Sequence, residues 1–104
     1  MDELFALALD IVREAGAHLH EGFGTIDREE IGYKGWRNLV TRYDLEVEQR
    51  VVERIRRACP GHAILAEEGG GHEGSSQFRW IIDPLDGTTN YVHHHPIYCV
   101  SLAV

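Results

Sequence analysis

Two carboxylates stand three positions apart in the segment Asp83-Pro-Leu-Asp86, and Gly-Thr-Thr follows them directly. Because proline fixes its own φ, we expect this segment to turn stiffly and to point both carboxylates into the same space. The same turn can aim the Leu85 carbonyl at that space. Carboxylates that lie close together repel one another unless a proton or a cation lies between them. Since Mg²⁺ prefers oxygen ligands, the segment predicts a magnesium site.

Three further carboxylates stand at the ends of predicted elements. Asp44 opens a predicted helix, and Glu67 and Glu68 follow a short predicted strand. Element ends are the places where a rigid scaffold presents side chains to a ligand. If the strands that end at Ala66 and Asp83 are neighbours, Glu67 and Asp83 converge.

The Gly87-Thr88-Thr89 segment suits an anion. Successive backbone amides at the start of a helical turn bind phosphate, and glycine lets the backbone approach closely. A threonine hydroxyl paired with a carboxylate can orient and deprotonate an attacking water. Metal ligands beside a phosphate site therefore predict metal-assisted transfer of a phosphoryl group to water.

Each of these residues also has a simpler interpretation. Asp83-Pro-Leu-Asp86 is also typical of a β-turn followed by a helix cap. Asp44 alone fits a helix cap, Glu67-Glu68 fits solvated charge, and Thr88 fits a cap or turn residue. A site is favoured because carboxylates at four element ends, with Glu67-Glu68 counted as one position, coincide with a Gly-Thr-Thr turn.

The elements that position these residues begin with a predicted helix over residues 2–23, followed by a loop or loose hairpin over 24–38. Apolar residues of the helix recur every three or four positions, which gives one buried stripe. The stripe consists of Leu4, Ala8, Ile11, Val12, Ala15, Leu19 and Phe23.

A second helix is predicted to begin at a capping box, Thr41-Arg-Tyr-Asp44, and to end before Pro60-Gly61. Its expected apolar face comprises Leu45, Val51, Val52, Ile55 and Cys59. Its expected solvent face comprises Glu48, Arg50, Glu53, Arg54, Arg56 and Arg57.

Strands are predicted over residues 63–66, 78–83 and 97–104, with a flexible loop over 69–77 and one helical turn before the last strand. This order predicts an α+β fold with layered helices on one face of a mixed or mainly antiparallel sheet, as a single domain over residues 1–104. The sequence ends inside an apolar strand, so we expect a longer protein, or a partner subunit that covers the strand.

The composition narrows the classes of partner. The formal net charge is −7 and no basic patch stands out, so nucleic acid and anionic membranes are not expected partners. No apolar run is long enough for a membrane span, and the acidic N-terminus is unlike a secretory signal. Two cysteines without a CxxC pair indicate a reducing, cytoplasmic setting.

Three segments together resemble one known family. "WIIDPLDGTTNYVHHHP" closely resembles the metal-binding signature of the inositol monophosphatases, "NLVTRYDLEVE" resembles their upstream segment, and "ILAEEG" resembles their acidic segment. The segments occur in the family's order with suitable gaps, and the resemblance extends from about Leu4 to Val104.

The resemblance implies a sugar-phosphatase-like αβαβα fold and a Mg²⁺-dependent, lithium-sensitive, dimeric phosphomonoesterase. It implies that Glu67, Asp83 and the Leu85 carbonyl hold one Mg²⁺ and that Asp83 and Asp86 share a second. It further implies that Asp44 and Thr88 activate water. The substrate phosphate would be bound by the Gly87 and Thr88 amides together with Glu67, Leu85 and Asp86. Glu68 would support the metal ligands, and Lys34 would lie in a mobile loop nearby.

The sequence departs from the family pattern in three residues and in length. Ala66 replaces a glycine, Tyr91 a phenylalanine, and Asn38 a common aspartate. Family members are more than twice as long, and the resemblance implies that their later half supplies a further metal-binding aspartate and most substrate contacts. We therefore expect these 104 residues alone to be nearly inactive. The alternative hypothesis is a non-catalytic fragment, which binds RNA or a transcription complex or assembles with itself, and in which the motif is unused.

Overall fold

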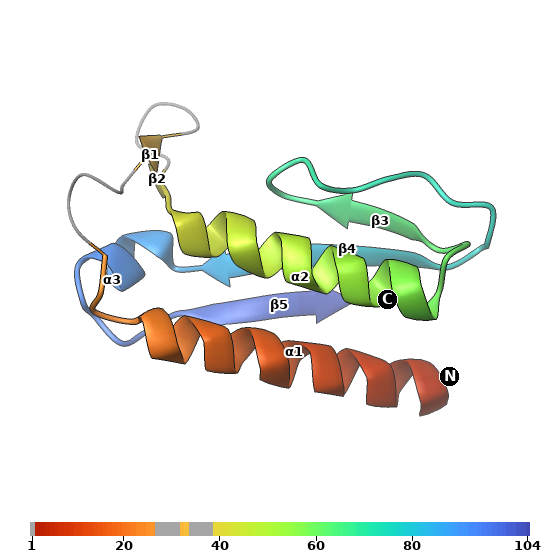
Figure 1. The fold of residues 1–104 in the computed structure, drawn as a ribbon, viewed down its shortest axis with the longest axis horizontal. Helices are drawn as coiled ribbons and strands as arrows, with labels where there is room; N and C mark the ends of the chain where they lie inside the picture. Colours follow the sequence, from red (N-terminus) through yellow and green to blue (C-terminus); the bar gives the residue numbers. More distant parts are fainter. Residues whose placement is uncertain (1, 27–31, 34–38) are drawn as a thin grey trace.

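The computed structural model describes residues 2–26, 32–33 and 39–104 of the chain (Figure 1). Its elements are α1 (Asp2–Gly22), β1 (Gly32–Tyr33), β2 (Leu39–Val40), α2 (Arg42–Ala58), β3 (Ala63–Ala66), β4 (Arg79–Asp86), α3 (Thr88–Val92) and β5 (Cys99–Ala103). The strand expected over 97–104 is therefore shorter than predicted, and the one expected over 78–83 extends three residues further, to Asp86. Lys34 and Asn38 lie outside the described residues.

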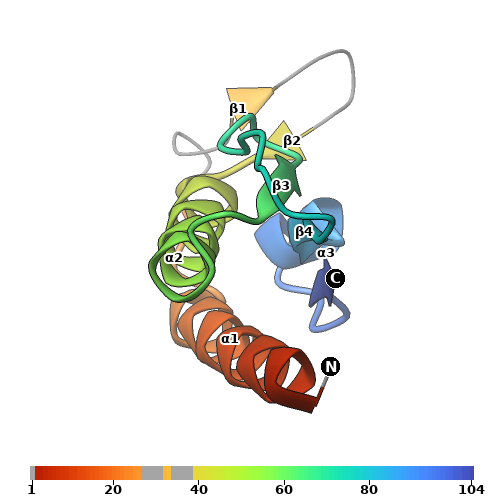
Figure 2. The same cartoon turned by 90° about the vertical axis from the view of Figure 1, so that its right-hand side faces the viewer.

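The main sheet has the strand order β3-β4-β5 and is mixed, as predicted. Strands β3 and β4 run parallel, whereas β4 and β5 run antiparallel. A separate antiparallel pair joins β1 to β2, and β2 lies just beyond the segment 24–38 that was expected to form a loop or loose hairpin. Helices α1 and α2 cover one face of the main sheet, and Figure 2 shows both on the same side of its strands. The α+β prediction is confirmed.

The core lies between the two long helices and this face of the sheet. The predicted stripe of α1 supplies Ile11, Ala15 and Leu19, and all three are buried. Trp80 from β4 and Tyr91 from α3 are among the largest fully buried side chains. Burial of such aliphatic and aromatic groups is the main favourable contribution to folding.

Strand β4 corrects the expectation that Asp83-Pro-Leu-Asp86 forms a turn. The strand continues through Pro84 to Asp86, and the pairing with β5 shifts register between Asp83, which faces Ser101, and Asp86, which faces Cys99. Three steps along β4 thus oppose two steps along β5, which is a β-bulge with one extra residue. Proline is tolerated in a strand at such a bulge because its missing N–H leaves no donor unpaired.

Helix α2 confirms the predicted capping box and corrects two predicted side-chain environments. Thr41 and Asp44 form reciprocal hydrogen bonds at its N-terminus. Leu45, predicted to be buried, is 52% exposed, whereas Glu48, predicted to face water, is only 4% exposed. Glu48 belongs to the buried face of α2, and Leu45 lies at the edge of that face, beside Val52. The buried residues of α2 are Tyr43, Asp44, Val47, Glu48, Val51, Val52 and Ile55.

Among the described residues, no helix has the length and apolar character needed to cross a membrane.

Candidate functional site

Glu67 and Asp83 lie side by side, as the sequence analysis expected if their strands were neighbours. The parallel register pairs Ala66 with Ile82, so the next positions along the two strands are Glu67 and Asp83. Partial burial, the hydrogen bond with Glu67 and repulsion from its charge raise the pKa of Asp83 to about 6. At neutral pH this pair therefore carries more negative charge than its surroundings compensate.

Asp86 lies on the same face of β4 as Asp83 because of the bulge. In a regular strand, side chains three positions apart point to opposite faces. The bulge puts two inward residues in succession, Pro84 and Leu85, so that Asp83 and Asp86 both point outward. The charge of Asp86 accordingly contributes to the raised pKa of Asp83. On β5, the exposed Cys99 thiol contacts the Asp86 carboxylate at 3.9 Å.

Asp44 and Thr88 form a second pair, which joins the start of α2 to the start of α3. The Thr88 hydroxyl lies 3.1 Å from Asp44 Oδ1 and 3.1 Å from the Leu85 carbonyl oxygen, and it can donate to either. Asp44 is 2% exposed, and its other oxygen accepts from the Thr41 amide and hydroxyl. Burial raises the pKa of Asp44, while the hydrogen bonds from Thr41 and Thr88 act in the opposite direction.

The cap interpretation of Asp44 is confirmed, and its predicted catalytic role stays a prediction. Oδ2 caps α2, and Oδ1 is available to the Thr88 hydroxyl. One carboxylate thus fixes the start of a helix and faces the Gly-Thr-Thr segment.

Gly87 makes the sharp connection from β4 to α3. Its φ is +92°, in the left-handed region, and a Cβ at this position would lie 3.0 Å from the Ile97 carbonyl oxygen. Both features require glycine. Gly87 alone separates Asp86, the last residue of β4, from Thr88, the first residue of α3, so the pair formed by Asp44 and Thr88 follows closely on the end of β4.

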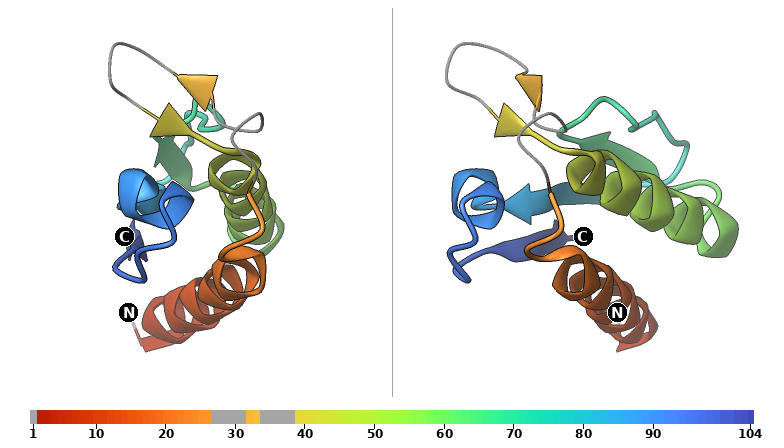
Figure 3. Two further views of the ribbon diagram at one scale, coloured as in Figure 1. Left: turned by 90° about the vertical axis from the view of Figure 1, so that its left-hand side faces the viewer. Right: turned by 60° about the vertical axis from the view of Figure 1, so that its left-hand side comes forward.

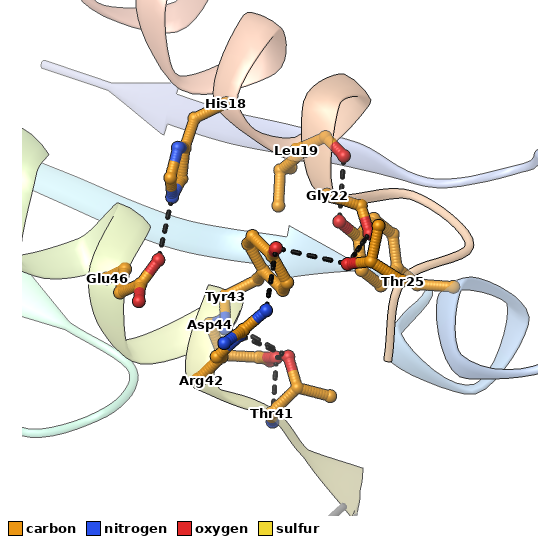
Figure 4. A network of polar contacts seen from close by, with 10 residues as sticks. His18, Leu19, Gly22, Thr25, Thr41, Arg42, Tyr43, Asp44 and Glu46 are labelled. Atoms are coloured by element: carbon orange, nitrogen blue, oxygen red, sulfur yellow. Dashed lines mark hydrogen bonds and ion pairs between the residues drawn. The ribbon is translucent and has the colours of Figure 1, made fainter. Parts of the chain in front are cut away.

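The start of α2 is itself held by a network of polar contacts to the end of α1 (Figure 4). The Tyr43 hydroxyl accepts from Arg42 and shares a hydrogen bond with Thr25, both at 3.2 Å. The Tyr91 hydroxyl donates to the Leu19 carbonyl at 2.7 Å. Figure 3 shows the end of α1, the start of α2 and α3 gathered at the same end of the molecule. These contacts fix the position from which Asp44 reaches Thr88.

Glu48 also belongs to this region, although it was predicted to face solvent. Its carboxylate accepts from the backbone amides of Glu68 and Gly70, directly beyond Glu67. The available signal was its spacing, because residues four apart on a helix share a face and Asp44 lies four positions earlier.

The described residues bring these groups together as pairs and not as a complete ligand set. Within residues 2–26, 32–33 and 39–104, no group of three or more His, Cys, Asp or Glu side chains is placed to hold a metal ion. A shallow depression lies on the open face of the sheet beside Glu67 and Asp83, and Leu65, Ile81 and Ser101 are among the residues that line it. The predicted metal and catalytic roles therefore stay predictions.

Comparison with known sequences agrees with the family resemblance of the three motif segments. A family model described as "Inositol monophosphatase family" matches residues 1–104. The chain is 40% identical to the Nus factor SuhB of Pseudomonas aeruginosa over 106 residues, and the match covers 99% of this chain and 39% of that protein. It is 43% identical to the inositol-1-monophosphatase of a Synechocystis species over 100 residues, which covers 94% of this chain and 34% of that protein.

Comparison with solved structures agrees. The extragenic suppressor protein SuhB from Bartonella henselae superimposes with a TM-score of 0.91 at 31% sequence identity, covering 97% of this chain and 40% of that one. The chain thus spans well under half the length of these relatives.

Proposed function

Because the chain belongs to the inositol monophosphatase family, we propose that it forms the first part of a Mg²⁺-dependent site that hydrolyses a phosphate monoester. Two contacts support this proposal most strongly. Glu67 lies beside Asp83 at the end of β4, and Asp44 lies beside Thr88 at the start of α3. The first pair suits a cation and the second suits a water molecule.

The donor chemistry of the first pair fits Mg²⁺. Glu67, Asp83 and the Leu85 carbonyl offer only oxygen atoms, and Asp86 adds a further carboxylate on the same face. Burial, and then the neighbouring carboxylates of Glu67 and Asp86, raise the pKa of Asp83, and a cation would neutralise this group in place of a proton. When bound, Mg²⁺ supplies charge neutralisation for the phosphate and for the entering and leaving oxygens.

Thr88 and Asp44 would position and deprotonate the attacking water. When the Thr88 hydroxyl donates to Asp44 Oδ1, its oxygen lone pairs remain free to accept a proton from water. Because burial raises the pKa of Asp44, its carboxylate is a stronger proton acceptor than an exposed one. The proton would pass from water to the threonine hydroxyl as that hydroxyl gives its own proton to Asp44.

The remaining parts of the proposal come from the family resemblance. The amides of Gly87 and Thr88 would bind the phosphate, Glu68 would support the metal ligands, and Lys34, outside the described residues, would lie near the site. A homodimer and a cytoplasmic setting complete the proposal, and the unpaired state of both cysteines is compatible with that setting.

Replacing Thr88 by valine should lower kcat for Mg²⁺-dependent phosphate release by about 100-fold or more, because general acid–base assistance contributes about 10²–10⁴-fold. Valine has nearly the same shape as threonine but cannot pass a proton to Asp44. The measurement is release of inorganic phosphate from a panel of phosphate monoesters by the complete gene product.

Thr88→Ser is the matched control, since it keeps the hydroxyl, and it should retain most of the activity. Equal activity in Thr88→Val and the unaltered protein would refute the proposed role of Thr88. No phosphate release under any condition with Mg²⁺ would refute the proposed function itself.

A second candidate function is a non-catalytic role in an RNA or transcription complex. It is favoured by the relatives named Nus factor SuhB, one of which is 40% identical to this chain. Those relatives give no support to the charge-based expectation that nucleic acid is not a partner. RNA binding by an Asp83→Asn variant that releases no phosphate would separate this role from catalysis.

A further inference from the structure

We propose that Glu48 is a positioning residue that holds the candidate metal ligand Glu67 in place, an inference that rests on the proposed function. Glu48 is not itself a candidate metal ligand. It acts on the backbone of the loop that carries Glu67, from the adjacent helix α2.

Both carboxylate oxygens of Glu48 are engaged by that loop. Oε1 accepts from the Glu68 amide at 2.6 Å, and Oε2 accepts from the Gly70 amide at 2.9 Å. Glu48 is 4% exposed, whereas Gly70 is exposed, so both hydrogen bonds are partly buried. Hydrogen bonds from backbone amides to a carboxylate are about twice as strong as those between neutral groups.

The two amides belong to a tight turn that begins at Ala66, the last residue of β3: Glu68 is the third residue of the turn, and Gly70 directly follows it. Within it, the Gly69 amide donates to the Ala66 carbonyl, and Gly69 has a φ of +91°. Glu67 is the second residue of this turn, so its backbone is fixed by β3 on one side and by the Glu48 carboxylate on the other. Without Glu48, the turn would lose two backbone contacts to α2, while its own hydrogen bond from Gly69 to Ala66 is 3.3 Å long.

The position of Glu48 on α2 explains why this contact matters for the site and not only for stability. Glu48 follows Asp44 by four residues, and both belong to the buried face of the helix. One helical turn of α2 therefore holds the Thr88 side of the site through Asp44 and the Glu67 side through Glu48. The rigid spacing between these two carboxylates sets how far the proposed water-activating pair lies from the proposed metal ligands.

Glu48→Gln tests this role. The amide side chain keeps the shape, but it presents an N–H₂ group to one of the two backbone amides, which breaks that contact. Loss of a group that orients a ligand typically costs about 10–100-fold in metal affinity. We expect Mg²⁺ affinity, measured by calorimetry on the chain, to fall by about that factor, and hydrogen exchange at the Glu68 and Gly70 amides to accelerate.

The substitution should change the Mg²⁺ concentration that the enzyme needs and leave its turnover rate nearly unchanged. In the complete gene product, Glu48→Gln should raise the Mg²⁺ concentration for half-maximal activity, while kcat at saturating Mg²⁺ changes little. Glu53→Gln, which removes an exposed carboxylate from the same helix, is the matched control and should change neither.

Gly70→Ala provides a second variant in case Glu48→Gln does not fold. It keeps the Glu48 charge, but the new Cβ would lie 2.7 Å from Glu48 Oε2 and would displace it. The same losses of Mg²⁺ affinity and amide protection are expected.

Unchanged Mg²⁺ affinity and unchanged amide exchange in a folded Glu48→Gln or Gly70→Ala chain would overturn the positioning role while leaving the proposed function intact. Absence of Mg²⁺ binding by the unaltered chain would instead overturn the proposed metal site, and the role of Glu48 with it.

Discussion

Exchanging Asp83 for asparagine should stabilise the chain in the absence of metal and at the same time abolish its Mg²⁺ binding. The pKa of Asp83 is raised from 3.8 to about 6 by burial and by Glu67. Because the folded state binds the Asp83 proton more tightly than the unfolded state does, the protonated carboxyl stabilises the fold. This stabilisation is fully present below about pH 4 and is lost as the pH rises through about 6. Above pH 6 the ionised group thus destabilises the fold, by about 1 kcal/mol after allowance for solvent screening.

The measurement is urea unfolding of the Asp83→Asn and unaltered chains in EDTA, at pH 7 and at pH 4. The variant should be more stable at pH 7, and the difference should shrink at pH 4, where Asp83 is protonated. Asp10→Asn is the matched control, because Asp10 is an exposed carboxylate on α1. A variant that is less stable than the unaltered chain at pH 7 would contradict the charge repulsion on which the metal site depends.

The same substitution that stabilises the metal-free chain should remove its Mg²⁺ binding and activity. Losing a group that merely orients a ligand costs about 10–100-fold in metal affinity or activity, so losing a direct ligand should cost more than about 100-fold. We expect no measurable Mg²⁺ binding by Asp83→Asn in calorimetry and no Mg²⁺-dependent phosphate release by the complete gene product. Undiminished turnover would refute the assignment of Asp83 as a metal ligand.

Replacing Gly22 by alanine should destabilise the fold by about 2–3 kcal/mol, which corresponds to a fall in Tm of roughly 10–15 °C for a chain of this size. A Cβ at Gly22 would lie 2.3 Å from two ring atoms of Tyr43. That ring cannot move aside easily, because it is buried against Tyr91 and its hydroxyl is held by Thr25 and Arg42 (Figure 4). Thermal unfolding followed by circular dichroism measures the effect.

Gly16→Ala is the matched control on the same helix. A Cβ at Gly16 meets no atom within 4 Å. Alanine has a higher helix propensity than glycine, so this change should stabilise the chain by about 0.5–1 kcal/mol. Equal effects of the two substitutions would show that helix propensity alone, and not the contact with Tyr43, decides the outcome at Gly22.

The sequence was most informative where chemistry and local structure depend on the same few residues. Thr41 and Asp44 have the spacing of a capping box, and the box is present. The α1 stripe followed from apolar periodicity, since period and burial are directly linked. The α+β class, with its mixed or mainly antiparallel sheet, followed from the order of the predicted elements. The adjacency of Glu67 and Asp83 could be stated only as a condition, because the pairing of β3 with β4 is a tertiary contact.

Two features were beyond local patterns. The segment from Asp83 to Asp86 was expected to turn, yet it continues as a strand, and a bulge across Pro84 brings the carboxylates to one face. The position of the bulge depends on how β4 pairs with β5, and the residues of the segment alone do not determine that pairing. Glu48 was assigned to solvent because isolated carboxylates are rarely buried. Its partners are backbone amides in a loop twenty residues later, which side-chain patterns cannot reveal.

The central claim is that Glu67, Asp83 and Asp86 surround a divalent cation, and a crystal grown with Mn²⁺ in place of Mg²⁺ tests it most directly. Anomalous scattering from manganese locates the ion without assumptions about its ligands. We predict a peak within coordination distance of the Glu67 and Asp83 carboxylates and the Leu85 carbonyl oxygen. Saturating Mn²⁺ that leaves no peak there, or one only at an unrelated place such as His93–His95, would contradict the claim.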